Sequence, residues 1–206
     1  MELRHFFEKF GVSKTYPKGT VLFKEGASAS YALLIVDGII QISKTVDDKQ
    51  FVVALRSEGD IIGEMIFDGQ PRSATATALN EVHGIYLASE TFRRIVHEEP
   101  EVTMMLFTTL LRRLREATDQ ASDMALIGVY ERVRKFLMSR LASTPFSQGD
   151  GLTGLTDIDA NFQAIGNHVG ASRDMISKIF KELIRGDYVK LDSGKIQINR
   201  KLPLKM

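Results

Sequence analysis

The sequence predicts an α+β protein built from an antiparallel β-structure, a long helix and a C-terminal winged helix-turn-helix. Three observations support this prediction. Short apolar runs separated by glycines fill residues 16–87, an apolar heptad pattern follows at 107–124, and residues 159–198 show the pattern of a helix, a glycine turn, a helix and a hairpin. Strands and helices that segregate along a chain are typical of α+β proteins.

Composition places the chain among globular proteins. It has 206 residues, of which 26% are charged and 44% hydrophobic, and this length suffices for one large domain or two small ones. No apolar run approaches the length of a membrane-spanning helix. The N-terminus carries charges throughout and lacks the apolar stretch of a secretory signal. We therefore expect a cytoplasmic protein with no membrane partner.

Residue usage argues against metal and redox chemistry. The chain has no cysteine, which excludes disulfides, thiol redox sensing and a cysteine-ligated iron–sulfur cluster. The four histidines are scattered, and none pairs with another ligand type at metal spacing: they are His5, His83, His97 and His168. We expect no metal, haem or iron–sulfur cluster. No nucleophile–base pair stands out either, so we do not expect an enzyme.

Residues 16–87 are expected to form the antiparallel β-structure. The expected strands are rich in Val, Ile, Leu, Thr and aromatic residues, and they lie within segments 20–26, 31–43, 51–60 and 73–87. Glycines and an Asp-Asp pair separate them. Many short strands with regular turn signals are typical of an antiparallel barrel or sandwich. The segment 63–68 breaks the pattern, and we expect one helical turn there.

A long helix is expected at about 101–127, after a shorter helix at 90–99 that ends at Pro100. The long helix carries an apolar heptad pattern formed by Phe107, Leu110, Leu114, Ala117, Ala121 and Met124. This face either packs on the chain's own barrel or joins a second copy. We favour a homodimer, because an amphipathic helix of this length usually serves more than one neighbour.

A further helix is expected at 129–142, and the Gly-, Ser- and Pro-rich segment 143–154 is expected to be a loop or a tight hairpin. The domain boundary is placed near Gly128. This division gives an N-terminal domain at 1–128, which includes the long helix, and a C-terminal domain at 129–206.

The C-terminal domain is expected to be a winged helix-turn-helix. Asn161 is the expected N-cap of its first helix, Gly170 supplies the turn, and Ser172 caps the second helix. The second helix has a stripe of residues expected to be buried, namely Ile176, Ile179, Phe180 and Leu183. The segment 188–198 is expected to be the hairpin that forms the wing.

The second helix has the chemistry of a DNA recognition helix, which inserts its N-terminal turns into the major groove. Arg173 and Lys178 can donate to guanine N7 and O6, and Asp174 can accept from the amino group of cytosine. Ser172 and the N-terminal amides suit a phosphate. The expected DNA-binding residues are Asn161, Gln163, Ser172, Arg173, Asp174, Ser177, Lys178 and Lys181. The alternative is a solvated face of the helix.

Charge is distributed unevenly along the chain. Residues 171–206 hold nine Lys/Arg against four Asp/Glu, whereas residues 1–100 hold eleven against fourteen. A basic C-terminal end is consistent either with a polyanionic partner or with chance clustering. Lys190 and Lys195 in the wing are suited to the DNA backbone, where they would add affinity that does not depend on the base sequence.

The stretch "GEMIFDGQPRSATATA", residues 63–78, places Glu64 and Arg72 among small and apolar residues. A buried ion pair is a poor stability device, because its desolvation cost is recovered only with near-ideal geometry. Arginine is the preferred partner of phosphate, and the amides of a helical turn bind anions. The charged pair therefore favours a ligand site.

These motifs resemble the cyclic-AMP receptor protein/FNR (CRP/FNR) family of bacterial transcription regulators. "IGNHVGASRDMISKIFKELIRGDYV" is similar to the DNA-binding motif of the family, and "GEMIFDGQPRSATATA" is similar to its phosphate-binding cassette. "FKEGASASYALLIVDGIIQI" resembles the preceding part of its sensor barrel, and "MALIGVYERVRKFL" resembles its hinge. The resemblance covers nearly the whole chain in the right order.

The resemblance implies a cyclic-nucleotide-binding β-roll, dimerisation through the long helix, a palindromic DNA operator and contact with RNA polymerase. It implies that Gly63 and Glu64 bind the ribose of cyclic AMP or a related cyclic nucleotide, and that Arg72 and Ser73 bind its phosphate. The full ligand-binding set that it implies is Gly63, Glu64, Met65, Arg72, Ser73, Ala74 and Thr118.

The sequence departs from the best-known family member at three points. The segment between Glu64 and Arg72 is shorter by one or two residues. The base-reading Thr-Ser pair becomes Ala117 and Thr118, and the recognition pattern Arg-Glu-x-x-x-Arg becomes Arg173-Asp174-x-x-x-Lys178. These departures keep open the alternative of the same DNA-binding regulator with another effector or none. A further alternative is a cyclic-nucleotide-binding regulatory module of an enzyme or channel, and the winged helix-turn-helix in the same chain argues against it.

Overall fold

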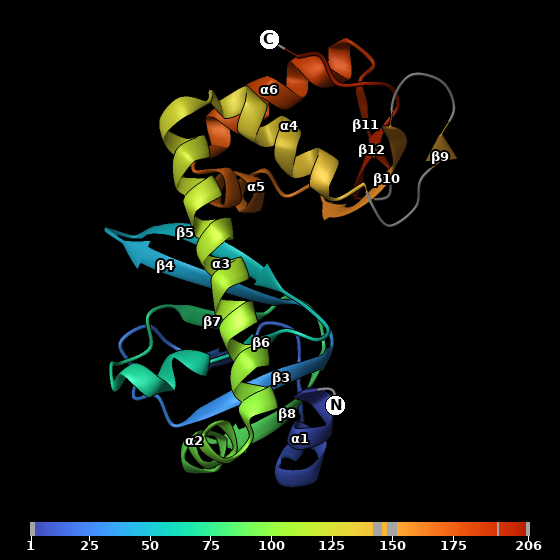
Figure 1. Ribbon diagram of the computed structural model, residues 1–206. Coiled ribbons are helices and arrows are strands. Elements are labelled where there is room, and N and C mark those ends of the chain that lie inside the picture. Colours follow the sequence, from blue (N-terminus) through green and yellow to red (C-terminus); the bar gives the residue numbers. More distant parts are fainter. Residues whose placement is uncertain (1–2, 142–145, 148–151, 193, 205–206) are drawn as a thin grey trace. The chain divides into compact units, whose positions relative to one another are not determined.

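Figure 1 shows the computed structural model of the protein, which describes residues 3–141, 146–147, 152–192 and 194–204. The chain forms two compact units, Met1–Glu116 and Ala117–Met206. The division falls within α3 (Pro100–Leu126), because the first turns of this helix pack into the core of the first unit through Val102 and Leu106. The limits 1–128 and 129–206 of the domains stay a prediction.

The first unit contains two four-stranded antiparallel sheets. One has the order β1-β8-β3-β6 and the other the order β2-β7-β4-β5. The strands are β1 (Val12–Tyr16), β2 (Val21–Phe23), β3 (Tyr31–Asp37), β4 (Ile40–Val46), β5 (Lys49–Arg56), β6 (Ile61–Ile62), β7 (Thr75–Ala78) and β8 (Val82–Ala88). The antiparallel β-structure expected from the sequence is confirmed.

The β-structure begins earlier than expected, at Val12 instead of Tyr16. Among the described strands, β1 pairs with β8 alone, from Val12 opposite Tyr86 to Tyr16 opposite Val82. Four of its five residues are exposed, because it lies at the edge of the sheet. An exposed edge strand buries no face, so it lacks the alternation of apolar and polar residues by which strands are recognised.

Strand β3 divides the core of the first unit into two layers. Leu33 and Ile35 pack between the sheets, whereas Ala32 and Leu34 face the helices. Alternate residues of a strand point to opposite faces, so a strand covered on both sides is apolar throughout. The covering helices are α1 (Leu3–Phe10), α2 (Ser89–Glu98) and the start of α3, as Figure 1 shows beside β3 and β8.

The described part of the second unit contains four helical segments and one sheet. The end of α3 is followed by α4 (Val129–Ser139), α5 (Phe162–Val169) and α6 (Arg173–Arg185). The sheet has the order β11-β12-β10-β9, formed by β9 (Phe146–Ser147), β10 (Leu152–Asp159), β11 (Val189–Asp192) and β12 (Lys195–Ile198). The wing hairpin is therefore confirmed, with two further strands beside it.

One sequence prediction in this unit needs correction, because helix α4 ends at Ser139, before the expected limit at 142. Of the loop and the hairpin expected at 143–154, the hairpin is confirmed: β9 and the start of β10 pair antiparallel, with Ser147 opposite Leu152. The rest of that segment, 143–145 and 148–151, lies outside the described residues. The long strand β10 was missed because its aspartates and glycine are poor strand formers.

The helix-turn-helix forms around the caps expected from the sequence. Asn161 Oδ1 accepts from the backbone N–H groups of Gln163 and Ala164, both at 3.1 Å. Ser172 Oγ accepts from Met175 N at 3.2 Å, and Gly170 turns the chain at φ 67°. The expected stripe of α6 is buried and packs with α4, α5 and the sheet: it comprises Ile176, Ile179, Phe180 and Leu183.

Candidate functional site

Strand β6 leads into a tight turn that carries the cassette residues. Gly63 has φ 78°, and a 3-10 turn, η1 (Glu64–Asp68), follows it, as expected from the sequence. A Cβ atom on Gly63 would lie 2.4 Å from Arg72 Nη1 and 2.8 Å from Tyr31 O. Only glycine therefore fits both the left-handed backbone and the close approach of Arg72.

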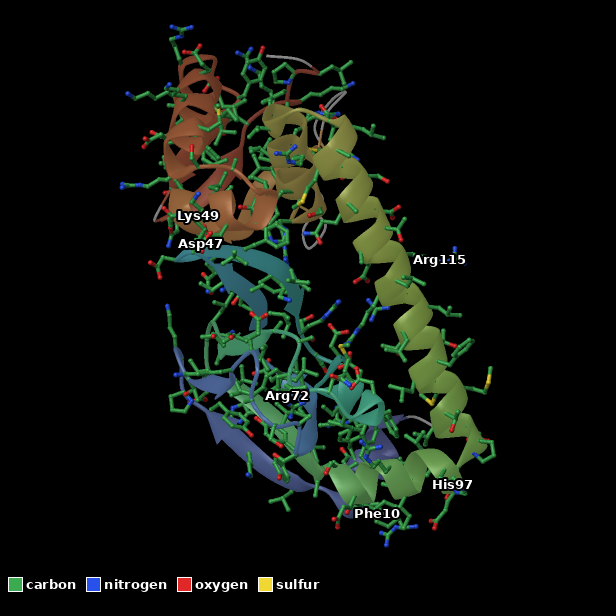
Figure 2. All side chains as sticks on the ribbon, turned by 90° about the vertical axis from the view of Figure 1, so that its left-hand side faces the viewer. Phe10, Asp47, Lys49, Arg72, His97 and Arg115 are labelled. Carbon is green, nitrogen blue, oxygen red and sulfur yellow. The ribbon has the colours of Figure 1, made fainter. Side chains whose placement is uncertain are left out.

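Arg72 is a buried charge held by backbone carbonyls and aromatic rings. Its side chain lies inside the β-structure (Figure 2), and the residue is only 6% exposed. Nη1 donates to Gly63 O at 3.1 Å and Nη2 to Tyr31 O at 2.6 Å. Its guanidinium carbon lies 4.2 Å from the ring centre of Phe23 and 4.9 Å from that of Tyr31. These contacts form a cation–π pocket around the guanidinium.

Burial shifts the pKa values of Arg72 and Tyr31. It lowers the pKa of the Arg72 guanidinium, and the negative charge of Glu64 opposes that shift. Burial likewise raises the pKa of Tyr31 to about 12, so its hydroxyl stays protonated and donates to Leu22 O at 2.7 Å. Arginine remains charged in proteins even when buried, so the pocket holds one fixed positive charge.

Glu64 forms an ion pair with α3, a partner that the sequence did not indicate. Its Oε1 lies 2.5 Å from Arg113 Nη1, and the two side chains are only 10% and 15% exposed. Arg113 Nη2 also donates to Ile61 O. From the sequence, no role was expected for Arg113. The adjacent arginines at 112 and 113, close to the register of Ala117, were the available signal.

Two buried donors in this region lack an acceptor. Within the part of the chain that the structure describes, Nε of Arg72 and Nε of Arg113 are buried without a hydrogen-bond partner. Leaving a buried donor unpaired costs about 1–3 kcal/mol. Such groups in a native protein call for an explanation, and a bound ligand is one.

The expected ligand residues of the first unit lie at η1 and in the segment between η1 and β7, where Arg72 contacts Gly63 and Ser73 contacts Met65. Ser73 is exposed, and its Oγ donates to Sδ of Met65 at 3.3 Å. Met65 is 49% exposed, whereas Ala74 is buried. Thr118 lies on α3 in the second unit, so its place in the ligand site stays a prediction.

The expected DNA-binding residues form an exposed face of the second unit. Ser172, Arg173, Asp174, Lys178 and Lys181 are exposed on and before α6, and Ser177 is half-buried beside them. Asn161 and Gln163 are exposed at the start of α5. A surface hollow of about 520 Å³ is lined by residues of both elements. The lining residues are Ala160, Asn161, Phe162, Gln163 and Arg173.

Comparison with known proteins decides the family. Residues 13–99 match the model of the Cyclic nucleotide-binding domain. The cAMP-activated global transcriptional regulator CRP of Pasteurella multocida is 30% identical over 173 residues, which cover 82% of this chain and 80% of that protein. The chain belongs to the CRP/FNR family of transcription regulators. The CRP-like cAMP-activated global transcriptional regulator of Mycobacterium tuberculosis is 27% identical over 89% of this chain and 82% of its own length.

Solved structures of the CRP/FNR family share the fold. The c-di-GMP responsive regulator CLP of Xanthomonas campestris superposes with a TM-score of 0.79 at 20% identity, covering 95% of this chain and 97% of that chain. FixK2 of Bradyrhizobium japonicum gives 0.77 at 18% identity, with 93% of each chain covered. The predicted α+β architecture is therefore confirmed, and the relatives are transcription regulators rather than enzymes.

The described ranges offer neither a metal centre nor a membrane-spanning helix. No group of three or more His, Asp or Glu side chains in those ranges is arranged to hold a metal ion. None of the helices found there is both long and apolar enough to cross a membrane.

Proposed function

We propose that this CRP/FNR protein is a homodimeric, cytoplasmic regulator that binds a cyclic nucleotide, most directly cyclic AMP, in its β-roll and responds by changing its affinity for DNA. The observation that carries the proposal is the buried cassette. Glu64 is paired there with Arg113, Arg72 donates to two carbonyl groups, and the Nε of Arg72 has no partner among the described residues. The cAMP-activated relatives support this choice of effector.

The cassette supplies the two kinds of group that a cyclic nucleotide needs. The Glu64 carboxylate accepts from the ribose 2′-hydroxyl, and the Arg72 guanidinium donates to the cyclic phosphate. Arg72 uses two of its N–H groups for Gly63 O and Tyr31 O, which leaves other donors, Nε among them. Ser73 must turn its hydroxyl from Met65 Sδ toward the phosphate to add a further bond.

The DNA-binding half of the proposal rests on α6. Its exposed N-terminal turns carry Arg173, Asp174 and Lys178, which enter the major groove and read base edges. Two copies related by a two-fold axis then require a palindromic operator. RNA polymerase is the further partner that a regulator bound at a promoter would contact.

The proposed dimer is formed through α3. Apolar side chains of the expected heptad pattern are largely exposed: Phe107 is 54%, Leu110 41%, Leu114 64% and Met124 39% exposed. This exposure favours a second copy as their partner over the chain's own β-structure, because a helix normally buries its apolar stripe. The effector controls DNA binding only if it binds the DNA-competent dimer more tightly than the other state.

A second effector class should be tested beside cyclic AMP. The Xanthomonas relative in fold is described as c-di-GMP responsive, so this architecture serves more than one nucleotide. In this chain the segment between Glu64 and Arg72 is short, and Ala117 offers no hydroxyl to a base. Both features reduce the contacts available to an adenine without touching the sugar and phosphate partners.

Isothermal titration calorimetry tests the ligand directly. We expect the purified protein to bind cyclic AMP and Arg72→Ala to lose the binding, because the alanine removes the buried cation. Arg93→Ala is the matched control, since Arg93 is exposed on α2 and lies over Phe67. Absence of heat with cyclic AMP, cyclic GMP and c-di-GMP would refute the nucleotide proposal.

A further inference from the structure

The ion pair between Glu64 and Arg113 is part of a larger network in the first unit. Arg113 faces a second carboxylate, because its Nη2 lies 3.8 Å from Oδ1 of Asp60. Arg113, Glu64 and Asp60 are only 15%, 10% and 16% exposed in their side chains. One poorly solvated cation therefore lies between two poorly solvated anions, at unequal distances.

Asp60 is itself shared between two arginines. Nη2 of Arg112 reaches the same Oδ1 at 3.1 Å. The other oxygen, Oδ2, accepts from Ser57 N at 3.2 Å and so fixes the direction of the carboxylate. Arg112 is in turn held by Glu116 at 2.6 Å, and Glu116 also binds Arg56 at 3.0 Å. In this arrangement Oδ1 of Asp60 pairs with Arg112, and Glu64 pairs with Arg113.

We propose that Asp60 is a positioning residue that competes with Glu64 for Arg113 and thereby sets the affinity of the effector site. The inference rests on the proposed function, since it assigns Glu64 to the effector's sugar. A hydroxyl that donates to Glu64 weakens the hold of that carboxylate on Arg113. Arg113 then needs a shift of only about 1 Å to reach an ordinary ion-pair distance from Asp60.

This competition predicts changes of opposite sign for two neighbouring charges. Asp60→Asn removes the second anion near Arg113, so Arg113 remains bound to Glu64. The effector must then displace Arg113 from Glu64 with no other carboxylate to receive it. Arg112→Gln removes the rival cation from Oδ1 of Asp60, so Asp60 draws Arg113 away and leaves Glu64 accessible. If the network only stabilised the fold, both substitutions would weaken effector binding or leave it unchanged.

The first test is calorimetry of the full-length protein with cyclic AMP. We expect the dissociation constant to rise about tenfold in Asp60→Asn and to fall about threefold in Arg112→Gln, changes of about 1.4 and 0.7 kcal/mol. Arg115→Gln is the control, because Arg115 is exposed and points away from the β-strands in Figure 2. Two changes of the same sign, or no change in either variant, would overturn the proposal.

The second test needs no nucleotide and separates this inference from the proposed function. Urea unfolding is measured for Asp60→Asn, for Glu64→Gln and for the double variant, as a double-mutant cycle. If both carboxylates share Arg113, the effect of Asp60→Asn on the unfolding equilibrium constant should be at least fivefold larger when Glu64 is replaced. Additive effects would overturn the role of Asp60, whether or not wild-type protein binds cyclic AMP.

Discussion

The β-roll and helix α6 carry their charges in opposite ways. Arg72 in the β-roll is 6% exposed and is already bound by two carbonyls and two aromatic rings. Arg173 and Lys178 on α6 are exposed to solvent. A buried charge is little affected by salt but strongly affected by the loss of a partner, whereas exposed charges respond to ionic strength.

The difference indicates how each region would recognise the partner proposed for it. A ligand of the β-roll would have to fit around existing bonds, so geometry and a few donors and acceptors would select it. DNA bound at α6 would meet a face whose cations are already accessible, and counterion release would supply much of the affinity. The two regions should therefore differ in their sensitivity to substitution, pH and salt.

The largest effect on stability is expected from a substitution next to the buried guanidinium of Arg72. Gly63→Ala should lower the free energy of unfolding by about 3 kcal/mol, because the methyl group strains a left-handed backbone and displaces Arg72 from two carbonyls. Urea unfolding measures the loss.

Gly69→Ala is the matched control for this substitution. Gly69 has φ 69°, similar to the 78° of Gly63, but among the described residues no heavy atom beyond its two chain neighbours lies within 4 Å of the position that a methyl group would take there. It should lose only the backbone contribution, about 1–2 kcal/mol. Equal losses in the two variants would show that Arg72 contributes nothing beyond backbone strain.

A buried histidine of the second unit, His168, extends the comparison to the dependence of stability on pH. Burial lowers the pKa of His168 to about 4, with a further contribution from the positive charge of Arg140. The ring lies 4.3 Å from that of Phe136, and its Nδ1 is buried without a partner within the described residues. The folded protein therefore keeps this histidine neutral over a range in which an unfolded chain protonates it.

The sign of the pH effect follows from this lowered pKa. Between about pH 6.5 and 4 the unfolded state binds a proton that the folded state does not. The contribution of His168 to the free energy of unfolding is therefore fully present above about pH 6.5, and it falls by up to about 3 kcal/mol as the pH approaches 4. His168→Gln should remove this part of the pH dependence, which is measured as the difference between wild-type and variant urea unfolding at each pH. Parallel pH profiles would contradict the assignment.

Substitutions on the exposed face should have smaller effects that depend on the DNA sequence. Arg173→Ala and Lys178→Ala should each weaken operator binding by about 1–3 kcal/mol and relax the base preference at one position. Lys190→Ala in the wing should instead weaken binding to all sequences alike and reduce the salt dependence. Fluorescence anisotropy with matched and mutated operators at several salt concentrations distinguishes the two. A uniform loss in Arg173→Ala would remove it from base recognition.

The features that depend on local sequence spacing were predicted best. The stripe of α6, the caps Asn161 and Ser172 and the turn after Gly63 depend on local spacing, and each is confirmed. Strand β1 was missed because an edge strand buries no face, and β10 was missed because turn-forming residues interrupt its pattern.

The candidate effector site was only partly predictable. Spacing identified Glu64 and Arg72 as a charged pair in an apolar segment, but their partners depend on tertiary distances that no local pattern encodes. Glu64 binds Arg113 of a distant helix, and Arg72 binds carbonyls of its own β-roll. The exposure of α6 was easier to predict, because it depends on the spacing of residues within one helix.

The central claim is that a nucleotide bound at the buried charges controls DNA binding by the exposed ones. The direct test is operator affinity, measured by fluorescence anisotropy on DNA selected from a randomised palindrome, with and without cyclic AMP. We predict that cyclic AMP tightens binding at least tenfold in wild type and in Arg93→Ala but has no effect in Arg72→Ala. Equal operator affinity of the wild type with and without cyclic AMP, cyclic GMP and c-di-GMP would contradict the account.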